Sequence, residues 1–212
     1  MDDHGDLSKL PDIPRLMRLM QSLALLDAIL SPEWEYRYYS FNAHWADGEQ
    51  MGSIRTGSGD ELFALFTAFG CYIKGFDHEQ ADPRVPSAAF YSQLPQPFAT
   101  QAMEPAFSPE DVSFCLWRGL ADQEWRRTEV PACPPGYDGS EWLLELFDGR
   151  PDSYRAFASS YFEVQLGHDE ITALYEHRPL APQIVVSLNP DAVWEDVQVE
   201  AKEIGYPASE LA

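Results

Sequence analysis

Four strand-like segments joined by short turns fill residues 34–76 and constrain the fold more than any other feature. Their sequences are rich in aromatic and β-branched residues, which favour strands: Trp34–Phe41, Gln50–Arg55, Glu61–Phe66 and Cys71–Phe76. Connections this short join only antiparallel neighbours, because parallel strands need a crossover of a dozen residues or more. We therefore predict an antiparallel meander, which a fifth strand at Val112–Arg118 extends.

The segment before this sheet has the pattern of an amphipathic helix. Between Leu16 and Leu30, leucine and methionine recur at steps of three and four residues. Asp12 and Pro14 suit the start of such a helix, and Ser31-Pro32 ends it.

The chain after the meander changes from irregular to helical. Residues 77–109 are rich in proline and predict irregular cover with one short helix near 98–103. Pro131–Gly139 has the composition of a linker. Helical periodicity then returns in five segments: Ser140–Phe147, Pro151–Leu166, Glu170–His177, Pro182–Leu188 and Ala192–Ile204.

Strands followed by helices are the order of an α+β protein. The 212 residues suffice for one core without disulfides or metals. We expect a single domain over 1–212, with 34–118 mainly sheet and 140–205 mainly helical. In it, an antiparallel sheet of about five strands packs against the N-terminal helix and a C-terminal group of helices.

The charge of the chain limits the classes of molecule that it can bind. It has 35 acidic and 14 basic residues, a formal net charge of −21, and the excess is larger in residues 101–212 (21 acids, 7 bases) than in residues 1–100 (14 acids, 7 bases). Such a surface repels nucleic acid and anionic membranes and attracts basic proteins. We expect a basic protein partner, with no nucleic acid and no membrane.

The cysteines and the N-terminus indicate the cytoplasm. Cys71, Cys115 and Cys133 are odd in number and lack CxxC spacing, which is typical of buried thiols in a reducing compartment. The first residues are acidic, unlike the start of a secretory signal, and the apolar stretch 16–30 is interrupted by polar residues.

A Gly-x-Gly pattern, Gly57 and Gly59, lies between Arg55 and Asp60. A phosphate-binding loop needs a helix N-terminus and usually a lysine, whereas here a predicted strand follows and two acids adjoin the glycines. The pattern favours a hairpin turn with positive φ over an anion site.

Asp77-His78-Glu79 and His168-Asp169-Glu170 combine imidazole with carboxylates, but neither has the spacing of a metal-ligand motif. We expect no metal and no cofactor, and polar turns or helix caps at both places. Acidic pairs such as Glu33 with Glu35 and Glu141 with Glu145 are expected by chance among 35 acids. No Gly-x-Ser-x-Gly nucleophile motif occurs.

The tryptophans divide into two groups. Trp34, Trp45 and Trp117 lie in predicted strands and are expected in the core. Trp125 stands between charged residues, where either half-burial on an edge strand or a role as an interface anchor fits.

One tract carries a resemblance. Three segments carry it: Tyr38-Tyr39-Ser40-Phe41-Asn42, Met51–Phe63 and Lys74-Gly75-Phe76-Asp77-His78-Glu79. Together they resemble a family of uncharacterised bacterial proteins and are similar to small acidic immunity proteins encoded beside secreted toxins. The likeness covers about residues 34–80 and 114–118. It implies neutralisation of a toxin and brings no catalytic residues with it.

These observations support three hypotheses. The leading one is a cytoplasmic binding protein, an immunity protein or inhibitor that occludes a basic toxin domain through Trp125 and through acids on the last helix, Glu195, Asp196, Glu200 and Glu203. The second is a small enzyme or ligand-binding domain that uses Arg55, Asp60, His78 and Glu79. The third is a subunit of a larger assembly.

Overall fold

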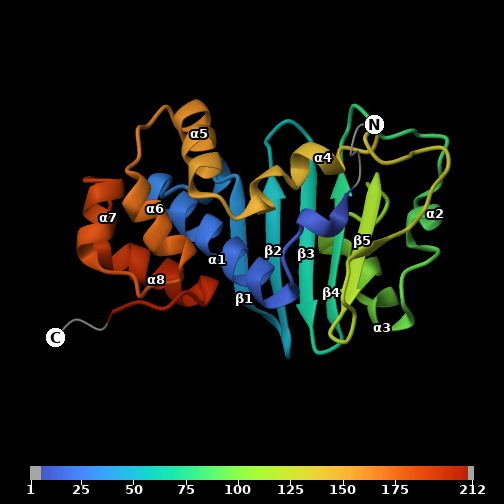
Figure 1. Ribbon diagram of the computed structural model, residues 1–212, viewed down its shortest axis with the longest axis horizontal. Helices are drawn as coiled ribbons and strands as arrows, with labels where there is room; N and C mark the ends of the chain where they lie inside the picture. Colours follow the sequence, from blue (N-terminus) through green and yellow to red (C-terminus); the bar gives the residue numbers. More distant parts are fainter. Residues whose placement is uncertain (1–5, 210–212) are drawn as a thin grey trace.

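The computed structural model describes residues 6–209 and contains a six-stranded antiparallel sheet in sequential order (Figure 1). The strands are β1 (Tyr39–Ala46), β2 (Glu49–Arg55), β3 (Glu61–Thr67), β4 (Gly70–Phe76), β5 (Phe114–Gly119) and β6 (Arg126–Arg127). The predicted α+β meander is confirmed. The two-residue strand β6 was not predicted, because so short a segment has no period of its own.

The first strand begins later than the sequence predicts, at Tyr39 instead of Trp34. Trp34–Tyr36 form a 3-10 turn, η2, and β1 starts only at Tyr39. Arg55 at the end of β2 donates its amide to the Tyr38 carbonyl at 2.9 Å. The start of β1, the end of β2, the start of β3 and the end of β4 therefore share one end of the sheet.

Helix α1 (Ile13–Leu30) covers one face of the sheet, as predicted (Figure 1). Asp12 caps it by accepting the Arg15 amide at 2.9 Å, and Pro14 stands in its first turn. Its apolar side chains pack on Ile54, Leu62 and Ile73 of the sheet in the larger of two core clusters. Within residues 6–209, no helix combines the length and apolar character that crossing a bilayer requires.

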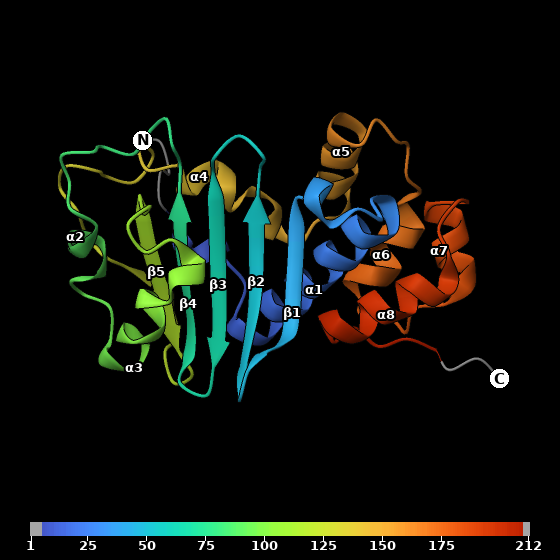
Figure 2. The same cartoon turned by 180° about the vertical axis from the view of Figure 1, so that it is seen from behind.

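The opposite face is covered by the proline-rich segment, which contains α2 (Ser87–Tyr91), α3 (Gln96–Ala99) and the 3-10 turns η3 (Gln101–Met103) and η4 (Pro105–Phe107) (Figure 2). Phe107 stacks on Phe63, with ring centroids 5.0 Å apart, in the second core cluster. Short helical turns thus occur before, within and after the region 98–103, where one short helix was predicted.

The C-terminal helices lie beyond β1, at the end of the molecule opposite α2 and α3 (Figures 1 and 2). They are α5 (Pro151–Tyr161), α6 (His168–Tyr175), α7 (Pro182–Leu188) and α8 (Trp194–Ile204), preceded by α4 (Ser140–Leu143) and the 3-10 turn η5 (Glu145–Asp148). Their buried residues share the larger cluster with α1 and the sheet. Helix α5 ends five residues before the predicted Leu166, since Tyr161 is its last residue.

Pro131–Gly139 does not form an exposed linker, despite its composition. Cys133 and Asp138 are buried, and the Ser113 hydroxyl at the start of β5 donates to the Asp138 carbonyl at 2.6 Å. Asp138 also forms an ion pair with Arg127. Contacts with residues distant in sequence therefore fix this segment on the sheet. All three cysteines are free and buried, as expected.

Candidate functional site at one end of the sheet

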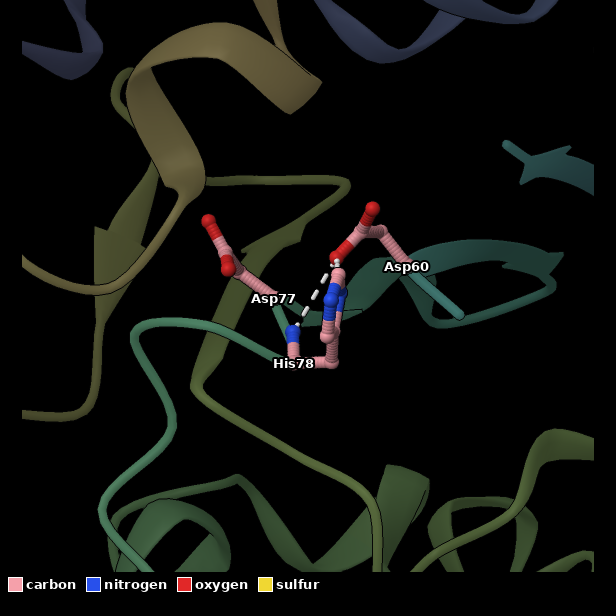
Figure 3. Close-up of side chains that lie close together, drawn as sticks. All are labelled: Asp60, Asp77 and His78. Carbon is pink, nitrogen blue, oxygen red and sulfur yellow. Dashed lines mark hydrogen bonds and ion pairs between the residues drawn. The ribbon is translucent and has the colours of Figure 1, made fainter. Parts of the chain in front are cut away.

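The two polar sequence motifs meet where β3 begins and β4 ends, because Glu61 pairs with Phe76 in the ladder. Figure 3 shows the resulting contact: His78 Nδ1 lies 2.6 Å from Asp60 Oδ1, and the His78 amide donates to the same oxygen at 3.0 Å. Thr56 Oγ1 donates to the other oxygen at 3.1 Å. The arrangement joins the β2–β3 turn to the segment after β4.

The electrostatics of this pair favour an ion pair. Burial opposes ionisation of Asp60, but the hydrogen bonds from His78 and Thr56 outweigh it, and the pKa of Asp60 is lowered. The hydrogen bond to Asp60 raises the pKa of His78 above its ordinary value. The His78 side chain itself is exposed to solvent.

Asp77 holds the neighbouring turn and the start of the C-terminal region. Its Oδ1 accepts the amides of Glu79 and Gln80 at 2.9 and 3.0 Å, and its Oδ2 accepts Trp142 Nε1 at 2.9 Å. Trp142 of α4 is thereby fixed in one orientation. The buried carboxylate of Asp77 therefore connects the end of β4 to α4.

Asp60, Asp77 and His78 bring together three possible metal ligands, whose donor atoms lie within 4.8 Å of one another. All four carboxylate oxygens already accept hydrogen bonds from protein groups, and His78 Nδ1 is bound to Asp60. Protein groups thus satisfy both carboxylates without a cation. The geometry therefore favours a structural clamp, and the absence of a bound metal stays a prediction.

The Gly57–Gly59 turn has the backbone that its sequence predicts. Gly57 has φ +77° and Gly59 has φ +109°, a region that residues with a Cβ rarely adopt. Strand β3 follows the turn, so the loop is a hairpin connection and not a helix N-terminus.

The side chain of Arg55 lies against two aromatic rings and is not part of the Asp60–His78 contact. Its guanidinium lies 5.0 Å from the centroid of Trp34 and 5.4 Å from that of Phe63, and burial lowers its pKa. Of the four residues in the enzyme hypothesis, the structure thus joins Asp60 and His78. Arg55 packs between aromatic rings, and Glu79 is exposed.

A cavity of about 770 Å³ opens at the same end of the molecule, between η5, α5 and the start of β1. Tyr38, Trp142 and Phe157 form its aromatic wall, and the exposed carboxylates of Glu145 and Asp152 lie at its rim together with Arg150. Asp152 already pairs with Arg155 and His168, both at 3.2 Å. Neither Arg55 nor His78 lines this cavity.

Exposed aromatic side chains continue from the cavity along η2. Phe157 stacks on Tyr161 with centroids 5.3 Å apart, and the Tyr161 hydroxyl donates to the Tyr36 carbonyl at 3.4 Å. Trp34, Tyr36 and Tyr161 are 56%, 60% and 40% exposed. The expectation that Trp34 lies in the core is wrong, whereas Trp117 is buried and Trp45 packs against the second cluster.

Two of the predicted partner-binding residues have other roles. Trp125 is only 6% exposed, and its Nε1 donates to the Pro11 carbonyl at 2.7 Å, so it is a core residue and not an interface anchor. Glu200 forms a bidentate ion pair with Arg37, at 2.7 and 3.0 Å. Glu195, Asp196 and Glu203 are exposed on α8, as predicted.

Sequence reasoning missed the aromatic surface because it assigned Trp34 and Tyr36 to a buried strand. Acids alternate with aromatic residues in Glu33-Trp34-Glu35-Tyr36, which is the period of a half-buried strand, so the sequence carried no local signal of this exposure. Comparisons with protein-family models, with curated proteins and with solved structures found no match to this chain.

Proposed function

We propose that this protein binds a basic protein partner and, as an immunity protein does, neutralises a toxin domain by covering it. The observation that carries the proposal is an excess of exposed carboxylates that form no ion pair with a basic side chain. Within residues 6–209, Glu145 at the cavity, Glu33 and Glu35 beside Trp34, and Glu195 and Glu203 on α8 have no cationic group within 4 Å.

This charge gives a binding protein two properties. Long-range attraction raises the rate of encounter with a basic partner, and like-charge repulsion excludes acidic competitors. Exposed acids contribute only ~0–1 kcal/mol each to folding, so a net charge of −21 is poorly explained by stability. The compartment proposed for this activity is the cytoplasm.

The test is affinity purification of the tagged protein from the source organism, followed by kinetics with the purified partner. We expect a partner of high isoelectric point and an association rate that falls steeply as salt rises above 0.15 M, where the Debye length is about 8 Å. The dissociation rate should change less. A neutral or acidic partner, or association indifferent to salt, would contradict the proposal.

The alternative is a small enzyme, and the Asp60–His78 pair is the observation in its favour. A carboxylate that orients an imidazole recurs in general-base catalysis. A screen of the purified protein against ester and phosphoester substrates distinguishes the two functions. Turnover that is lost in His78→Asn, with folding intact, would favour the enzyme.

A further inference from the structure

We infer that the partner docks on the aromatic surface formed by Trp34, Tyr36 and Tyr161 and the adjoining cavity, and that it presents arginine side chains there. This inference rests on the proposed function and deepens it, because the sequence had placed the docking surface at Trp125 and on the last helix. The occupant is a basic protein segment.

The first argument is the combination of aromatic rings with carboxylates on one surface. Glu33 and Glu35 flank Trp34 in the chain, and all three side chains are exposed. Protein interfaces derive most of their affinity from a few aromatic anchors, which a rim of polar groups surrounds. Helix α8 offers Glu195, Asp196 and Glu203, but the large apolar side chain exposed on it is Val199, with no exposed aromatic ring.

The second argument is that other side chains hold Tyr161 and Trp142 in place. Tyr161 contacts Tyr38, Phe157 and Phe162 with centroids 5.4, 5.3 and 4.9 Å apart. Trp142, on the far wall of the cavity, is held by the buried carboxylate of Asp77. Rings that are ordered before binding lose less conformational entropy when a partner docks.

The third argument concerns arginine specifically. A guanidinium stacks on aromatic faces and binds carboxylates bidentately, while an ammonium is a compact, strongly hydrated charge. Arg55 already shows the aromatic contact on Trp34, with its guanidinium 5.0 Å from the ring centroid. The exposed aromatic rings and the neighbouring Glu33, Glu35 and Glu145 provide the same chemistry to an incoming arginine.

The experiment uses two fluorescent probes of equal charge, a nonaarginine and a nonalysine peptide, with the full-length protein at 0.05 M and 0.3 M salt. Two matched triple charge reversals are compared: Glu33→Lys with Glu35→Lys and Glu145→Lys, and Asp191→Lys with Glu195→Lys and Asp196→Lys at the start of α8. Glu203 is left unchanged because it lines a small pocket together with Trp34. Each triple reversal removes three acids and adds three bases. We expect the first to weaken nonaarginine binding at least tenfold more than the second.

A second pair of variants measures what the aromatic rings contribute to binding. Trp34→Ala with Tyr36→Ala should abolish the preference for nonaarginine over nonalysine, which we expect to be about threefold or more in the native protein. Phe69→Ala, at an exposed ring in the turn between β3 and β4, is the control and should leave that preference unchanged. Circular dichroism and thermal unfolding establish that each variant is folded.

The outcomes separate the two proposals. The α8 triple reversal could weaken nonaarginine binding as much as the Glu33, Glu35 and Glu145 reversal does, or the two peptides could bind the native protein equally well. Either result would contradict the proposed docking surface but not the proposal that the partner is basic. If neither peptide binds at 0.05 M salt, or binding ignores salt, the proposed function itself fails.

Discussion

The hydroxyl of Tyr154 donates a 2.7 Å hydrogen bond to Oδ1 of Asp27, a carboxyl group that lies fully buried on α1. The other oxygen of Asp27 accepts the amides of Tyr38 and Tyr39 at 2.9 and 2.7 Å. One side chain thus ties α1 to α5 and to the start of β1, where the wall of the cavity begins. The sequence shows Asp27 only as an interruption of an apolar helix.

We predict that Asp27 makes stability depend on pH. Burial raises its pKa from 3.8 to about 7, against the opposing effect of its hydrogen bonds. Because the folded-state pKa lies above the unfolded one, the stabilising contribution is complete below about pH 4 and is lost as pH rises to about 7. The slope from this group is at most about 1.4 kcal/mol per pH unit.

The measurement is urea denaturation of the native protein and of Asp27→Asn between pH 4.5 and pH 8. The native protein should lose stability across this window relative to the variant, which lacks the titrating group. Parallel pH profiles for the two proteins would contradict the prediction.

His78 should titrate above its ordinary pKa because Asp60 holds it. Its contribution to stability is therefore present at low pH and is lost as pH rises through the folded-state pKa. NMR titration of the imidazole measures the pKa directly, and Asp60→Asn should lower it. An unaltered His78 titration in Asp60→Asn would show that the contact is absent in solution.

Gly57 should tolerate asparagine better than valine. Its φ of +77° is accessible to asparagine but costs a β-branched residue about 1–2 kcal/mol. Among residues 6–209, no atom beyond the two adjacent residues lies within 4 Å of a Cβ built at this position, so we attribute the loss to backbone strain. Thermal unfolding of Gly57→Val and Gly57→Asn gives the comparison, and equal stabilities would mean that the turn relaxes.

Trp125→Phe should destabilise the protein without weakening partner binding. The change removes the hydrogen bond to the Pro11 carbonyl, which contributes about 0.5–1.5 kcal/mol, and leaves part of the buried volume unfilled. Denaturation and a binding titration on the same preparation test both halves of the prediction. A variant that keeps its stability but loses binding would restore Trp125 as an interface anchor.

Metal removal should have no effect on folding. The cluster of Asp60, Asp77 and His78 is already internally bonded, so chelation by EDTA should leave the unfolding temperature unchanged. Stoichiometric zinc or manganese by elemental analysis, with destabilisation on chelation, would identify a cation site instead of a clamp.

Local features of the sequence were sufficient for the meander, for α1 and for the Gly57–Gly59 turn. Each depends on neighbours close in the chain: strand period, a capping residue, or a glycine that permits positive φ. The pairing of β3 with β4 then brought Asp60 next to His78, two residues that the sequence had marked separately.

Tertiary structure alone decided which polar and aromatic residues are available to a partner. Glu200 is paired with Arg37, 163 residues away, and Trp125 is bonded to Pro11, 114 residues away. Trp34, expected in the core, lies at the surface because β1 begins after it. The sequence by itself determined the order of the five longer strands, the turns between the first four and the net negative charge, because these follow from residue type and short-range spacing. Burial and pairing depend on segments that meet only after folding, and so the surface that can bind a partner was decided by the tertiary structure.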